Sequence, residues 1–146
     1  MKLYLDTCSI QRPLDTLNQT RLRLEAEAIL GILEQVDAGI VELISSTVLE
    51  LEIARNSLAM RREHGEQVLK RAIATIRVDV SVENRASEFA QRGLAVMDAL
   101  HLAVAEKANV DYFCTCDDKF LRRAKAIPEL RIVVVSPLEL IEVLEL

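Results

Sequence analysis

The chain has 146 residues, the length of a typical single domain, which is enough to bury a core without disulfides or structural metals. Its 51% apolar and 28% charged residues are typical of an ordered globular protein and exclude a disordered chain. The formal net charge of −5 excludes a surface that is basic throughout, so any nucleic acid has to be held by local basic patches.

Three cysteines are present, at positions 8, 114 and 116, with no metal-ligand spacing around them. Nothing at the N-terminus resembles a signal peptide, so we expect reduced thiols and a cytoplasmic protein. The longest purely aliphatic run covers only residues 132–135, far short of the ~20 residues that cross a bilayer. A membrane segment is therefore not expected.

In chain order, an apolar strand at residues 3–5 stops at Asp6, and a loop that contains Pro13 follows it to residue 19. Apolar residues at steps of three and four then predict a helix over residues 20–39. A strand is expected at 41–44, and Thr47 with Glu50 matches a capping box that opens a helix toward residue 55. A helix at 59–74 and a strand at 76–80 complete the first half.

The second half continues the alternation of helices and strands. Helices are expected at residues 81–91 and 97–108, followed by a strand at 112–115 and a basic helix at 119–126. A strand at 132–135 is apolar at every position, as in a sheet covered on both faces. Ser136, Pro137 and Glu139 then form the N-terminal signature of a last helix, which reaches residue 144.

This alternation predicts βαβ units and an α/β fold: a three-layer α/β/α sandwich with a mostly parallel five-stranded sheet, as one domain over residues 1–146. Ligands of such sheets bind beyond the carboxyl ends of the strands. Asp6 and Asp117 follow strands directly, and Glu50 lies about one helical turn beyond another strand. Together with Asp98, these acids are predicted to form one site.

Each acid also has an ordinary structural interpretation, as a turn residue or a helix cap. Four carboxylates at one sheet edge, however, repel one another unless a cation neutralises them. All-oxygen ligands favour Mg²⁺ or Mn²⁺ over zinc, and such ions support phosphodiester cleavage. The residues themselves therefore predict a metal-dependent hydrolase that acts on a nucleic-acid backbone.

Four segments resemble the acidic motifs of the PIN domain, the fold of VapC-type toxin ribonucleases, in the same order and spacing. They are LDT at residues 5–7, STVLEL at 46–51, MDALHLAVA at 97–105 and TCDDKF at 115–120. The resemblance covers nearly the whole chain and implies a Mg²⁺- or Mn²⁺-dependent endoribonuclease that often dimerises. It also implies a cognate antitoxin, because PIN toxins are usually held by one.

Carried over by position, the resemblance assigns the metal and the catalysis to Asp6, Glu50, Asp98 and Asp117. Thr115 would hold the acidic side chains by hydrogen bonds, and other supporting groups would be Thr7, Ser46 and Asp118. Arg12, Lys119 and Arg122 are candidates for phosphate contacts, although ordinary solvated positions explain them too. With five aromatic residues in the chain, recognition of single-stranded RNA by shape is expected, rather than by base stacking.

Two alternatives stay open at this stage. A receiver-type signalling domain also binds Mg²⁺ through clustered acids, but it needs an adjacent acidic pair after its first strand, which is absent here. A PIN-fold interaction module that has lost nuclease activity is the other alternative.

Overall fold

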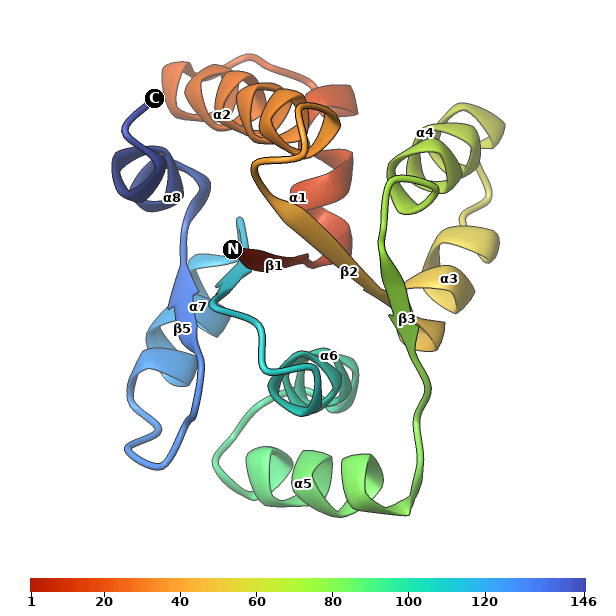
Figure 1. The fold of residues 1–146 in the computed structure, drawn as a ribbon, viewed down its shortest axis with the longest axis vertical. Coiled ribbons are helices and arrows are strands. Elements are labelled where there is room, and N and C mark those ends of the chain that lie inside the picture. The colour runs from red at the N-terminus through yellow and green to blue at the C-terminus, as the bar shows by residue number, and fades with distance from the viewer.

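A five-stranded parallel sheet forms the centre of the protein, described for residues 1–146 by a computed structural model (Figure 1). The strand order is β3-β2-β1-β4-β5. The strands are β1 (Lys2–Leu5), β2 (Glu42–Ser46), β3 (Ala74–Ile76), β4 (Tyr112–Cys114) and β5 (Val133–Val135). The predicted α/β class and five strands are confirmed, and the sheet is parallel throughout.

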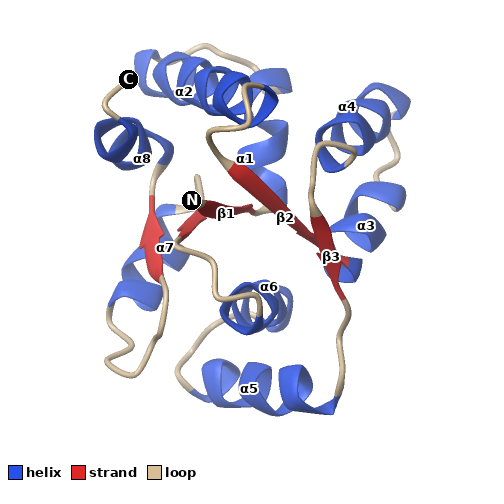
Figure 2. Ribbon diagram, viewed as in Figure 1, coloured by secondary structure: helices blue, strands red, loops and turns tan.

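Helices cover both faces of the sheet and complete the three layers (Figures 1 and 2). One layer contains α1 (Thr7–Gln11), α2 (Thr20–Asp37), α4 (Ala59–Leu69) and α8 (Pro137–Leu144), with the short 3-10 helix η1 (Arg12–Leu14) between α1 and α2. The opposite layer contains α5 (Val80–Gln91), α6 (Val96–Lys107) and α7 (Asp118–Lys125). The remaining helix, α3 (Thr47–Ala54), begins where β2 ends and packs against α4.

The chain reverses its direction across the sheet between β3 and β4. It adds β2 and β3 on one side of β1, then returns through α5 and α6 to add β4 and β5 on the other side. Crossovers of one hand place the helices of the two halves on opposite faces, as observed. The carboxyl ends of β1 and β4 are therefore the switch point at which such sheets bind ligands.

This strand order also removes the receiver-type alternative. Receiver domains have the order 2-1-3-4-5, in which the first strand lies between the second and the third. Here β1 lies between β2 and β4, and its Leu5 is in register with Cys114. The two topologies differ, and here the acids that follow β1 and β4 are the ones brought side by side.

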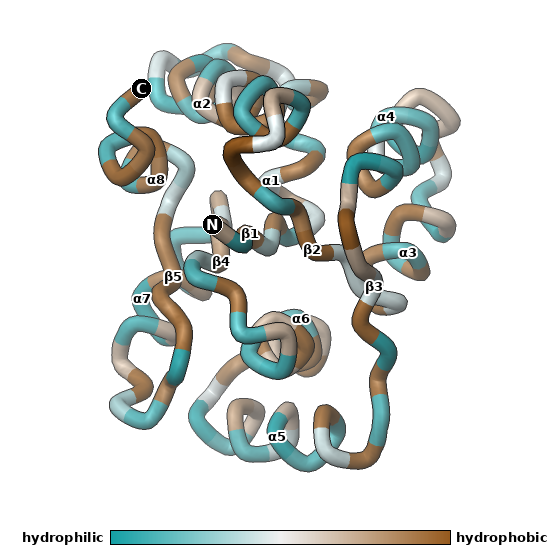
Figure 3. The backbone as a smooth tube through the Cα atoms, in the orientation of Figure 1, coloured by the Kyte–Doolittle hydropathy of each residue, from teal (hydrophilic) through white to brown (hydrophobic).

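The core is aliphatic, with aromatic rings at its centre. The rings of Tyr4 and Phe113 are stacked with centroids 5.1 Å apart, and Phe120 packs against Phe113 in a tilted arrangement at 5.4 Å. The tube along β5 in Figure 3 is hydrophobic, and Val134 and Val135 are buried. Burial explains the apolar residues at positions 134 and 135, but Val133, at the start of this edge strand, is exposed. The three cysteines are free, as predicted, and Cys114 and Cys116 are buried.

Some predicted boundaries are wrong. The segment after Asp6 was expected to be a loop, but it forms α1 and η1, with Asp6 as the N-cap and Pro13 inside the 3-10 turn. The third strand covers Ala74–Ile76 rather than residues 76–80, so the preceding helix ends earlier, at Leu69. The capping box between Ser136 and Glu139 is present as predicted. None of the helices has the length and apolar character of a membrane span.

Candidate active site

The carboxylate of Asp6 is fixed where β1 ends. As the N-cap of α1 it accepts a hydrogen bond from the backbone N–H of Ser9 at 3.0 Å, and the Cys8 thiol donates to the same oxygen, Oδ1, at 3.1 Å. Asp6 is only 7% exposed. The carboxylate therefore serves the local structure through Oδ1, while Oδ2 makes no hydrogen bond within the protein and is available to a ligand.

The end of β4 holds Asp117 in a similar way. The Thr115 hydroxyl accepts a hydrogen bond from the backbone N–H of Asp117 at 3.1 Å, which fixes the turn after the strand. Asp117 Oδ1 then caps α7 by accepting from the N–H of Phe120 at 3.0 Å. Thr115 was predicted to bond to the acidic side chains, but it acts on the backbone that carries one of them. Asp117 also keeps one free carboxylate oxygen.

Asp98 comes from the opposite helical layer, in the first turn of α6. Its side chain is half-buried and makes no hydrogen bond with the protein. Burial raises the pKa of Asp98, and the negative charges of Asp117 and Asp6 raise it further. Asp6, Asp98 and Asp117 thus lie close enough together for their negative charges to repel one another.

The fourth acid of the site is Glu52, and the prediction of Glu50 is wrong. Glu50 is exposed and does not line the pocket, whereas Glu52, two residues later on α3, does. Two residues turn a helix by about 200°, so the two side chains point in nearly opposite directions. The predicted capping box misplaced the helix start: the N-cap is Ser46, whose hydroxyl accepts from the N–H of Leu49 at 3.1 Å.

Glu52 is held by a hydrogen-bond chain that extends into the core. Its Oε1 accepts from the Thr7 hydroxyl at 2.7 Å and from Nε2 of His101. On the other side of the imidazole, Nδ1 lies 2.6 Å from the Tyr4 hydroxyl, which lies 2.7 Å from the Ser46 hydroxyl. An ionised carboxylate only accepts, so His101 donates from Nε2, and a neutral imidazole then accepts from Tyr4 at Nδ1.

This series of hydrogen bonds affects the pKa of Glu52. Burial acts to raise the pKa of Glu52, but the hydrogen bonds from His101 and Thr7 outweigh it and hold the pKa below the usual value. Thr7 contacts Glu52 directly, and Ser46 is connected to it through Tyr4 and His101. His101 was not among the residues that the sequence assigned to the site; its spacing of three from Asp98 on the same helix was the available signal.

The four acids line one cavity of about 410 Å³ at the switch point. Its wall also contains Gln11, Asn56 and Arg61, which no sequence pattern singled out. Arg61 donates to Asp15 at 2.8 Å, so this cation is already paired with an acid at the edge of the cavity. The carboxylates of Asp6, Asp98 and Asp117 have no lysine or arginine partner.

The other predicted residues are distributed differently. Asp118 is exposed and pairs with Arg21, which lowers the pKa of Asp118, so it points away from the cavity. Arg12 pairs with Asp15 at 2.8 Å and lies 3.6 Å from Glu25. Lys119 lines a smaller cavity of about 230 Å³ beside Asp98 and Asp117. Arg122 is exposed and lines neither cavity.

The donor atoms of the larger cavity suit a hard divalent cation. Asp6, Glu52, Asp98 and Asp117 offer carboxylate oxygens, the ligands that Mg²⁺ and Mn²⁺ prefer. No three acidic, histidine or cysteine side chains converge closely enough to form a ligand set by themselves. Magnesium usually keeps several water ligands and few direct carboxylate ligands, so such a set is not required for binding.

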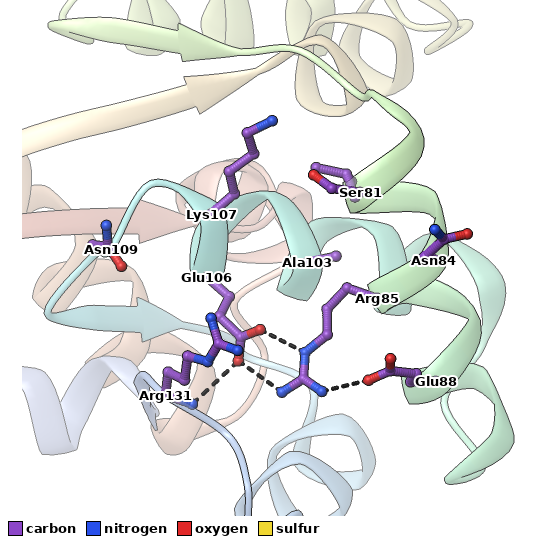
Figure 4. A pocket seen from close by; sticks show the side chains of 10 residues that line it. Ser81, Asn84, Arg85, Glu88, Ala103, Glu106, Lys107, Asn109 and Arg131 are labelled. Atoms are coloured by element: carbon purple, nitrogen blue, oxygen red, sulfur yellow. Dashed lines mark hydrogen bonds and ion pairs between the residues drawn. The ribbon is translucent and has the colours of Figure 1, made fainter.

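A second pocket, of about 500 Å³, lies between α5 and α6 and has a different character (Figure 4). Its buried acid, Glu106, accepts from Arg85 Nε at 2.6 Å and from the backbone N–H of Arg131 at 3.1 Å. Arg85 also pairs with Glu88 at 2.6 Å. Arg85 therefore pairs with both carboxylates, so the arrangement joins two helices and leaves neither carboxylate without a partner.

The fold and the acids at its switch point define a class of protein: a parallel α/β sandwich with a carboxylate centre. The family model of the PIN domain matches residues 3–126, so the chain belongs to the PIN domain family. A comparison with curated proteins gives no match.

Two solved structures have the same fold. The VapBC2 complex of Rickettsia felis, bound to a DNA fragment from its promoter, contains a chain with 17% identity and a TM-score of 0.61; the match covers 93% of this chain and 98% of that chain. PAE2754 from Pyrobaculum aerophilum has 14% identity and a TM-score of 0.54, covering 99% of this chain and 98% of that chain.

Proposed function

We propose that the protein is an endoribonuclease that uses Mg²⁺ or Mn²⁺ to cleave RNA phosphodiester bonds. The observation that carries the proposal is the gathering of Asp6, Glu52, Asp98 and Asp117 around one cavity, with no cationic side chain paired to the three aspartates. A site with this surplus of negative charge is suited to a divalent cation. Membership of the PIN domain family agrees with this chemistry.

The roles follow from the placement of the side chains. Asp6, Asp98 and Asp117 hold the cation, and Glu52 holds a second ion or orients the attacking water. A bound cation of this kind polarises the phosphoryl oxygens and lowers the pKa of a water ligand. The protein's own contribution is orientation: Ser9 and Cys8 fix Asp6, Thr115 fixes the turn that carries Asp117, and Thr7 and His101 fix Glu52.

Single-stranded RNA is the proposed substrate. Tyr4, Phe89, Phe113 and Phe120 are buried, so they offer no faces on which bases could stack. Contact with the backbone phosphates is therefore the main source of affinity, and Lys119 beside Asp98 and Asp117 is the best placed cation.

A cognate antitoxin and a second copy of the chain are the proposed protein partners. One structural neighbour is a VapBC complex, which is the support for the antitoxin. Exposed apolar side chains on α2 and α4 are a suitable surface for either partner: Leu24, Leu30 and Met60 are 47%, 49% and 71% exposed. The toxin role thus depends on this surface as well as on the acids.

The test compares Asp6→Asn with Asp37→Asn in cleavage of a labelled single-stranded RNA in Mg²⁺ or Mn²⁺. Asparagine is also a good N-cap, so α1 should persist in Asp6→Asn while cleavage falls about 100-fold or more. Asp37 is exposed and pairs with Arg71 far from the cavity, so Asp37→Asn should cleave like the wild type. Cleavage by Asp6→Asn at the wild-type rate would reject the proposal, and a folded wild type that never cleaves would favour the interaction module.

A further inference from the structure

The two cavities at the carboxyl edge of the sheet share a wall. Asp98 and Asp117 line both the cavity of about 410 Å³ and the neighbouring cavity of about 230 Å³. The larger cavity extends from these acids toward α4, and the smaller one extends along the start of α7. The acids therefore lie between two hollows rather than at the bottom of one.

Each hollow has cationic groups beyond the shared acids. Lys119 and Arg123 line the smaller cavity, and Arg61 lines the larger one. Lys119 is exposed and makes no salt bridge, whereas Lys125, on the same helix, pairs with Glu139 at 2.8 Å. The Arg123 guanidinium donates to the carbonyl of Gly93 at 2.8 Å and has no acidic partner. Lys119 and Arg123 thus place positive charge beside the acids in the smaller cavity. In the larger cavity Arg61 is paired with Asp15 through Nη2 at 2.8 Å, so it offers a phosphate the hydrogen-bond donors Nε and Nη1 rather than an unpaired charge.

We propose that a single RNA strand runs through both cavities, with its phosphates held by Lys119 and Arg123 on one side of the acids and by Arg61 on the other. This inference rests on the proposed function, because it places the scissile phosphate at Asp98 and Asp117. A flexible ammonium group suits a phosphate as a point charge, and a guanidinium group can bind one through two hydrogen bonds.

The arrangement has a consequence for the kind of cut. A strand that is held on both sides of the acids is cut internally, and a strand that ends at the acids loses the contacts of one cavity. We therefore expect substrates with nucleotides on only one side of the cleaved bond to be poor, and products to leave easily because each retains the contacts of a single cavity.

Binding is tested separately from cleavage, in the Asp98→Asn background with Mg²⁺ present. Fluorescence anisotropy with a labelled single-stranded 12-mer RNA compares Lys119→Ala with Lys125→Ala, which removes an equal charge from the same helix. Loss of one phosphate contact should weaken binding by Lys119→Ala about fivefold and reduce the slope of log affinity against log salt by about 0.7. Lys125→Ala should bind like the background protein.

The outcomes separate this inference from the proposed function. Equal affinities and salt slopes for Lys119→Ala and Lys125→Ala would overturn the inference, even if the wild type cleaves RNA. Dinucleotides bound as tightly as the 12-mer would also overturn it, since a single internucleotide phosphate cannot contact the basic groups of both cavities. Conversely, the wild type could bind RNA in a way that depends on Lys119 and on RNA length, yet fail to cleave it. That result would support the strand path and reject the proposed nuclease.

Discussion

Tyr4→Phe tests the hydrogen-bond chain behind Glu52 most directly. Tyr4 is fully buried, and its hydroxyl lies 2.7 Å from the Ser46 hydroxyl and 2.6 Å from Nδ1 of His101. Phenylalanine fills almost the same volume, so the change removes hydrogen bonds without creating a sizeable cavity. The His101 Nδ1 atom is left without a partner, while Ser46 keeps the hydrogen bond from Leu49.

The magnitude follows from this loss. A buried polar group left without a partner costs about 1–3 kcal/mol, so we expect the free energy of unfolding to fall by about 2 kcal/mol. With an unfolding entropy of about 0.3 kcal/mol/K for a chain of 146 residues, the midpoint of thermal unfolding should fall by about 6 °C. Cleavage should also fall, because the imidazole that orients Glu52 is no longer fixed.

Urea and thermal unfolding, followed by circular dichroism, measure the change. Tyr112→Phe is the matched control, since the Tyr112 hydroxyl makes no hydrogen bond within the protein and its ring is half-buried. Tyr4→Phe should lower the urea midpoint without a change in the slope of the transition, and Tyr112→Phe should leave both unchanged. If the two variants unfold at the same urea concentration, the hydrogen bonds that link Ser46, Tyr4, His101 and Glu52 contribute nothing to stability, and the prediction is wrong.

Three further outcomes are expected. Glu52→Gln should reduce RNA cleavage about 100-fold while Glu50→Gln stays within about twofold of the wild type, as measured by initial rates; the reverse order would restore Glu50 to the site. Asp98→Asn should raise the thermal midpoint in EDTA at pH 7. The pKa of Asp98 is raised in the folded state, so its ionised carboxylate destabilises the fold and the substitution removes that cost. The gain in thermal midpoint should shrink as the pH falls, because the wild-type carboxyl becomes protonated. A gain that persists at pH 3 would contradict this explanation. Gly65→Ala should destabilise the protein by about 1–3 kcal/mol in urea unfolding, because the new Cβ would lie 2.7 Å from Cγ2 of Ile53. In the control Gly31→Ala, the new Cβ meets nothing closer than 3.9 Å, so this variant should be more stable by about 0.5–1 kcal/mol.

The layers and the central strands were predictable because their signals are strong. The apolar run before Asp6, the fully apolar strand near the C-terminus and the capping box at Ser136 are local patterns, and the structure contains all three features. The edge strand β3 was misplaced because it has only three residues and little burial, so its sequence carries almost no alternation. The five residues of α1 are likewise too few to show a helical period.

The site was predictable where an acid follows a strand directly. Asp6 and Asp117 directly follow β1 and β4, and each is the N-cap of the next helix, so the position of each carboxylate is fixed by the local backbone. On α3, the glutamate that faces the cavity depends on where the helix begins. The N-cap is Ser46 rather than Thr47, and Glu52, not Glu50, lines the cavity. Arg61 could not be found, because it reaches the cavity from a helix with no motif of its own.

The position of β1 affects when the pocket first exists during protein synthesis. This strand is made first, yet β4, its neighbour on one side, is made more than 100 residues later, and the four acids belong to segments spread between positions 6 and 117. A ribosome-bound chain that has not reached Asp117 therefore lacks both the last acid and the strand that aligns it. The site of the proposed ribonuclease therefore stays incomplete until at least four fifths of these 146 residues have been translated.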